Sequence, residues 1–183
     1  MGSLNKFCDL CDNISLWTGK AIGWLIVPMM CGLTYEVTAR YLFNAPTLWA
    51  YDVTFILYGT HFMIGAAYTL LLGGHVRTEF IYSTLKPKWQ GLIDTIFYVS
   101  CFFPGLTIFL GVTTMFAYRS FLMNEKIVTS AWMPIIWPFK MMMPIGVLLL
   151  LIQGISELRK SVYAFRHNEL YPEFRSVGEE YDI

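Results

Sequence analysis

Charged residues are scarce in this chain of 183 residues. Asp, Glu, Lys and Arg make up 14% of it, where about 25% is usual in soluble domains. Apolar residues make up 56%, which is more than one small core needs to bury. The net charge is zero, so we expect no nucleic-acid partner. The composition argues against a water-soluble domain and places the surplus of apolar side chains against lipid.

Histidine and cysteine are also few, which limits the chemistry that the chain can carry. Cys8 and Cys11 form a single C-x-x-C, whereas a zinc site needs a second pair or two histidines. A haem held across two helices needs two histidines at similar depth, but only His61 lies near the middle of an apolar stretch. We therefore expect no catalytic residue, no metal and no cofactor. For His61 we favour a neutral, hydrogen-bonded imidazole, with a functional ionisable group as the alternative.

Long stretches without charge define the membrane spans. Residues 53–76 and 95–118 contain no Asp, Glu, Lys or Arg, and each exceeds the roughly 20 residues that cross a bilayer as a helix. Two other apolar stretches become long enough if the charged residues at their ends extend toward the headgroups. The sequence thus predicts an all-α membrane protein with four transmembrane helices. They are expected at about 17–38, 53–73, 92–117 and 139–158.

The same pattern predicts the boundaries of the chain's parts. Residues 1–167 are expected to form a single transmembrane domain, and the polar, acidic residues 168–183 a disordered tail. The start carries no cleavage pattern of a signal peptide, so the first span is expected to remain as an anchor.

The distribution of basic residues predicts the orientation. Because four spans place both ends on one side, nine basic residues fall on that side and four on the other. The positive-inside bias therefore predicts that both termini are cytoplasmic. The nine are Lys6, Lys20, Arg77, Lys86, Lys88, Arg159, Lys160, Arg166 and Arg175, and the four are Arg40, Arg119, Lys126 and Lys140.

Turn residues mark the connections between the spans. Asn44 and Pro46 predict a tight reversal after the first span. Gly73 and Gly74 are typical of a helix C-terminus, and residues 76–85 mix apolar and charged side chains as a short interfacial helix would. Three prolines inside the spans predict kinks. They are Pro28, Pro104 and Pro144.

Two acids and one arginine lie close to the predicted reversal. Glu36 and Arg40 are four residues apart with the acid first, the favourable order on a helix, and Asp52 begins the second span, where the helix dipole favours an anion. We expect Arg40 to reach both acids and to clamp the hairpin. The alternative is that Glu36 and Asp52 coordinate an ion or a substrate.

These residues carry a resemblance to a known family. Residues 36–52, followed by the glycine pair and its basic neighbours, resemble the small membrane (Q-type) subunit of tripartite ATP-independent periplasmic (TRAP) transporters over about residues 15–160. Asp52 stands where the family commonly has Glu, which shortens its reach. Ten residues of the resembling stretches are expected to have a structural role or to lie at the subunit interface. They are Glu36, Arg40, Asn44, Pro46, Trp49, Asp52, Gly73, Gly74, His75 and Arg77.

The resemblance implies a role as a partner and not as an enzyme. In such transporters a periplasmic binding protein captures an organic acid, and a large elevator-type subunit carries it inward with sodium. The small subunit would be a non-catalytic scaffold and anchor in the bacterial inner membrane, in contact with the large subunit, with lipids and, through the complex, with the binding protein. Two alternatives stay open: a membrane anchor of a respiratory oxidoreductase, and an independent oligomeric four-helix transporter.

Overall fold

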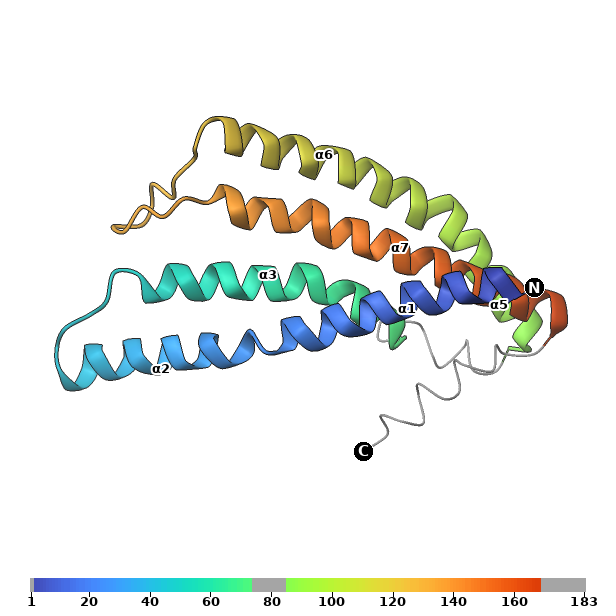
Figure 1. Ribbon diagram of the computed structural model, residues 1–183, viewed down its shortest axis with the longest axis horizontal. Coiled ribbons are helices and arrows are strands. Elements are labelled where there is room, and N and C mark those ends of the chain that lie inside the picture. Colours follow the sequence, from blue (N-terminus) through green and yellow to red (C-terminus); the bar gives the residue numbers. More distant parts are fainter. Residues whose placement is uncertain (1, 74–84, 169–183) are drawn as a thin grey trace. The chain divides into compact units, whose positions relative to one another are not determined.

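Most of the part that the structure describes is helical. The structure is a computed structural model, which describes residues 2–73 and 85–168, with side chains from residue 8 onward. Figure 1 shows the elements in chain order. They are α1 (Gly2–Gly23), α2 (Ile26–Leu42), α3 (Ala50–Leu71), α5 (Pro87–Phe97), the π-helix η1 (Tyr98–Phe102), α6 (Phe103–Leu122) and α7 (Trp137–His167). Within these ranges the only β pairing is an isolated bridge between Lys126 and Ile135.

Four helical stretches are long and apolar enough to cross a membrane, which confirms the prediction of an all-α chain with four candidate spans. The stretches are Cys8–Leu42, Ala50–Leu71, Pro87–Leu122 and Trp137–His167. The first and last are longer than the apolar stretches in the sequence. The added turns are polar on one side, and Ser15 in the first and Ser161 in the last are buried. A helix continues past its lipid-facing length when one side packs against protein.

The first span is interrupted one turn before Pro28. α1 ends at Gly23 and α2 begins at Ile26, a break that is visible in Figure 1. Because Pro28 has no N–H, the carbonyl of Trp24 loses its usual donor and accepts instead from the N–H of Val27 at 3.2 Å. The N–H of Leu25 likewise donates to the carbonyl of Ile22, three residues back, at 3.0 Å.

The other two prolines differ in their effect. η1 ends two residues before Pro104, and its end is marked by the N–H of Phe103, which donates to the carbonyl of Tyr98, five residues back. Such π-segments accommodate a register change in an otherwise regular helix. Pro144 lies inside α7, which is assigned as one continuous helix. Pro28 and Pro104 therefore adjoin a local departure from the α-helix.

The connections between the helices use residues in the left-handed region. Asn44 has φ of 52° just after α2, and the N–H of Ala45 donates to the carbonyl of Ala39 at 3.0 Å. Gly73 has φ of 69° just after α3, and its N–H donates to the carbonyl of Leu70. Both conformations suit Asn and Gly best. The predicted interfacial helix at 76–85 falls almost entirely on residues outside the described part.

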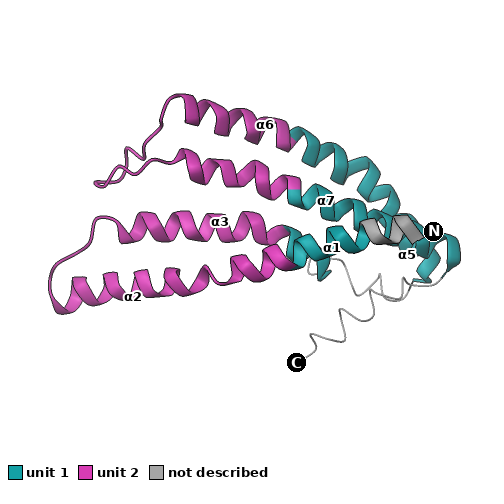
Figure 2. Cartoon of the chain, viewed as in Figure 1, with its two compact units in different colours: residues 1–16, 67–108, 149–183 teal, residues 17–66, 109–148 magenta. Residues whose placement is uncertain are grey.

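Contacts within the chain cluster into two compact units, coloured in Figure 2. Unit 1 comprises residues 1–16, 67–108 and 149–183, and unit 2 comprises residues 17–66 and 109–148. In unit 2, α3 and α7 pack closely: a Cβ added to Gly146 would lie 2.5 Å from the backbone oxygen of Met63. In unit 1, a Cβ on Gly91 would lie 2.5 Å from the backbone oxygen of Ser161. That residues 1–167 form a single domain stays a prediction.

The close approach at Gly146 gives a direct test of this packing. Gly146→Ala should lower the free energy of unfolding by about 1–3 kcal/mol, because the new methyl group meets backbone that cannot rotate away. Gly111→Ala is the matched control, since a Cβ there meets nothing within 4 Å; it should be neutral or stabilising by up to about 1 kcal/mol. Thermal unfolding of both variants in detergent measures the difference. Equal stability would contradict the packing of α3 against α7.

Candidate functional site

Glu36 is the centre of the predicted hairpin cluster, and it is buried at 8% exposure. Its Oε1 accepts hydrogen bonds from Arg40, with Nε at 3.0 Å. Its Oε2 accepts from the backbone N–H of Thr47 at 2.9 Å and from the Thr47 hydroxyl. Both carboxylate oxygens therefore have protein donors, and α2 is tied to the segment that precedes α3. Because the Arg40 side chain is 55% exposed, Thr47 supplies the sheltered part of this contact.

Asp52 has a different partner from the one that the sequence led us to expect. Its Oδ2 accepts from the hydroxyl of Ser130, whose oxygen also accepts from the N–H of Trp132 at 3.1 Å. Between the described side chains the structure records no ion pair of Arg40 with Asp52, because Arg40 folds back onto Glu36, one turn away on its own helix. Asp52 instead joins the start of α3 to the connection between α6 and α7.

The other residues of the predicted set have different surroundings. Trp49 stacks on Tyr35, with ring centroids 6.0 Å apart and an interplanar angle of 25°. Asn44 and Pro46 lie in the connection from α2 to α3, and Gly73 follows the end of α3 in unit 1. Gly74, His75 and Arg77 lie outside the described residues.

Lys140 takes part in a cluster that the sequence reading missed. Its Nζ lies 2.5 Å from Glu125 Oε2 and 3.9 Å from the ring centroid of Phe116, and its side chain is 7% exposed. A buried ammonium needs such a carboxylate and benefits from an aromatic face. The only sequence signal was a single lysine between two apolar stretches, which does not identify its partner.

His61 lies near the middle of α3 and is partly exposed. Its Nδ1 is 3.1 Å from the carbonyl oxygen of Ile22, at the break between α1 and α2. A carbonyl only accepts, so Nδ1 carries the proton and Nε2 is the acceptor of the neutral ring. The His61 ring thus contacts a carbonyl next to the helix break in unit 2, and its protonation state stays a prediction.

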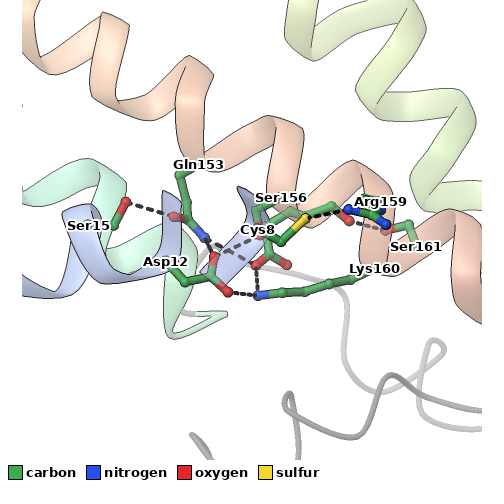
Figure 3. A network of polar contacts seen from close by, with 9 residues as sticks. Cys8, Asp12, Ser15, Gln153, Ser156, Arg159, Lys160 and Ser161 are labelled. Carbon is green, nitrogen blue, oxygen red and sulfur yellow. Dashed lines mark hydrogen bonds and ion pairs between the residues drawn. The ribbon is translucent and has the colours of Figure 1, made fainter. Parts of the chain in front are cut away.

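A second polar cluster lies in unit 1, where α1 meets α7 (Figure 3). Asp12 on α1 accepts from Gln153 Nε2 at 2.9 Å and from Ser156 Oγ at 2.7 Å, and it pairs with Lys160 Nζ at 3.0 Å. Ser15, one turn further along α1, donates to Gln153 Oε1 at 2.7 Å. Gln153 and Ser156 are fully buried, so these bonds satisfy polar groups that have no access to solvent.

The same cluster continues along α7. Lys160 Nζ also pairs with Glu157 at 2.8 Å, as expected for neighbouring charges at the end of the last span, and Arg159 donates to Cys8 Sγ at 3.3 Å. Sequence reasoning missed Asp12 and Gln153. A signal existed, because Gln153, Ser156, Glu157 and Lys160 repeat at helical spacing on one side of α7.

The geometry describes how helix ends are held together. In both units an acidic side chain on one helix accepts from donors on a different segment, and these charge-assisted bonds fix the two segments in register. Cys8 and Cys11 are buried free thiols. Among the described side chains, no group of three His, Cys, Asp or Glu residues is placed to hold a metal ion.

Lys160 is the charge on which the cluster of unit 1 depends. Lys160→Met keeps the length and the apolar part of the side chain but removes the ammonium group that pairs with Asp12 and Glu157. The free energy of unfolding should therefore fall by about 3–5 kcal/mol. Lys20→Met, an exposed lysine of α1, is the control and should change little. Denaturation in detergent compares them. If both variants unfold alike, the network does not stabilise the chain.

The Glu125–Lys140 pair predicts a pH dependence. The hydrogen bond from Lys140 holds the pKa of Glu125 below its ordinary value of 4.5. A carboxyl with a lowered pKa in the folded chain stabilises it fully above the ordinary value, and this stabilisation is lost as the pH falls through the lowered pKa. Wild type should therefore melt above Glu125→Gln at neutral pH, and the gap should close in acid. A gap independent of pH would refute this.

Comparison with known protein families identifies the family to which the chain belongs. The sequence model of the family described as tripartite ATP-independent periplasmic transporters, DctQ component, matches residues 29–163, which is most of the chain. No curated protein matches the chain significantly. The matched region includes the hairpin cluster, all of α3, α5 and α6, and most of α2. The chain therefore belongs to the DctQ family and is a multi-pass inner-membrane small permease subunit of a TRAP transporter.

Proposed function

We propose that this chain is a scaffold and membrane anchor for the large, elevator-type subunit of a sodium-driven TRAP transporter for organic acids. The observation that carries the proposal is the state of Glu36, whose two oxygens both accept from protein donors. A sodium or substrate site needs carboxylate oxygens that are open to the ion. Glu36 instead connects α2 to the segment before α3 through Thr47.

The exposed aromatic side chains support a role at the membrane surface and beside a partner. Tyr41, Phe43 and Tyr51, around the α2–α3 connection, are all strongly exposed. Aromatic rings of this kind suit the headgroup layer. With both termini cytoplasmic, as we propose, this connection faces the periplasm, where it can contact the substrate-binding protein.

The other two functions considered from the sequence have less support. A haem-carrying anchor of a respiratory oxidoreductase needs a histidine on each of two helices at similar depth. Among the described residues the other histidine, His167, lies at the end of α7 and not near the middle of a span. An independent transporter would need a proton or ion site of its own, for which His61 is the candidate. Absorbance near the haem Soret band tests the first, and uptake by the chain without partners tests the second.

Reconstitution tests the scaffold role. We expect no substrate uptake by liposomes that contain this chain only. We expect uptake that depends on a sodium gradient when the large subunit and the binding protein are added, and loss of most uptake when this chain is left out. The substrate is the ligand that the binding protein carries. Robust uptake by the isolated chain, or full uptake without it, would contradict the proposal.

A further inference from the structure

Three basic side chains lie together in unit 1, where α5 begins and α7 ends. Lys86 and Lys88 stand at the start of α5, and Arg166 lies in the last turn of α7. The backbone N–H of Lys88 donates to Asn168 Oδ1 at 3.3 Å, across 80 residues of sequence. The Lys88 ammonium also lies 5.9 Å from the ring centroid of Phe165 on α7. These contacts place the two helix ends side by side, and we call the three cations the α5–α7 basic cluster.

No acid within the described residues neutralises this cluster. All three cations are exposed, and the ion pairs that the structure records between described side chains include none of them. Lys160, earlier on α7, differs because its ammonium pairs with Asp12 and Glu157. The first acid along α5 is Asp94, six residues after Lys88, which is about 9 Å along a helix. The cluster therefore presents an uncompensated positive charge at the surface.

The cluster lies at the level where two candidate spans end. α5 begins the span Pro87–Leu122, and α7 ends the span Trp137–His167. Trp89, next to Lys88, is 56% exposed, and an exposed tryptophan at a span end is typical of the headgroup layer. The phosphates of lipids lie in this layer, so the charge and the depth of the cluster fit the same ligand.

Apolar side chains continue from the cluster along α5. Ile93, Ile96 and Phe97 follow Trp89 on this helix and are all exposed. A surface with cations at the headgroup level and apolar side chains below them matches both parts of a phospholipid. A soluble anion would use only the cations.

We propose that the α5–α7 basic cluster binds the phosphodiester headgroup of an anionic phospholipid, whose acyl chains lie along α5. The Arg166 guanidinium can donate two parallel hydrogen bonds to the phosphate. Lys86 and Lys88 add two positive charges from a different helix, so the bound headgroup links the ends of α5 and α7. With both termini cytoplasmic, as proposed above, the lipid belongs to the cytoplasmic leaflet, which attracts such basic groups when it is anionic.

Lipid competition tests the site in the purified full-length chain. Detergent micelles offer equal amounts of phosphatidylglycerol and phosphatidylcholine, and native mass spectrometry measures the ratio of the two lipids that remain bound. Wild type should retain phosphatidylglycerol in preference. Lys86→Gln and Lys88→Gln should each lower the ratio about fivefold, the effect of one cation near an anionic headgroup.

Two control variants separate the charge from other effects of substitution. Lys88→Arg keeps the charge and should keep the preference of wild type. Lys126→Gln removes an exposed cation of unit 2, where Glu125 is the preceding residue, and should also behave like wild type. Inorganic phosphate in excess should leave phosphatidylglycerol bound, because it lacks the acyl chains that contact α5.

Four results would overturn the proposal. They are equal retention of both lipids by wild type, equal losses for Lys88→Gln and Lys126→Gln, loss of the preference in Lys88→Arg, and displacement of phosphatidylglycerol by inorganic phosphate. A preference that emerges only when the chain is cut after Asn168 would also contradict it. In that case the acidic residues 169–183 of the chain itself, and not a lipid, occupy the cluster.

Discussion

A charged side chain among membrane-spanning helices must find its partner within the protein, because lipid tails supply none. Most of the order in this chain follows from that constraint. Glu36 holds the α2–α3 hairpin through Thr47, and Lys140 holds the connection before α7 through Glu125. Lys160 holds α1 to α7 through Asp12. Each contact satisfies a buried charge and, by doing so, fixes two segments, which are distant in sequence in the case of Asp12 and Lys160.

The same constraint applies to the backbone where a helix is interrupted. Pro28 removes one donor, and the helix shifts to three-residue bonds at Leu25 and Val27. The carbonyl of Ile22 then receives a second donor from His61 on another helix. His61 therefore contacts the backbone at the interruption between α1 and α2. The position of a single histidine in the sequence does not predict this contact.

The sequence predicted the features that depend on local composition. Uncharged stretches located the four spans, and Asn44 and Gly73 marked helix ends by their backbone preferences. It did not predict partners across long separations, such as Asp12 with Lys160 or Asp52 with Ser130. These depend on which helix sides face each other, and hydrophobicity does not encode that. We expected Arg40 to reach both Glu36 and Asp52 because all three lie near the reversal. Arg40 contacts Glu36, since a partner one turn away needs less ordering of the side chain.

Pairing charges inside the chain also limits how it can bind other subunits. Groups that are already neutralised contribute little to association, so binding in the membrane must come from close packing and uncharged hydrogen bonds. A subunit whose charges are paired within the chain is stable in the membrane before its partner arrives.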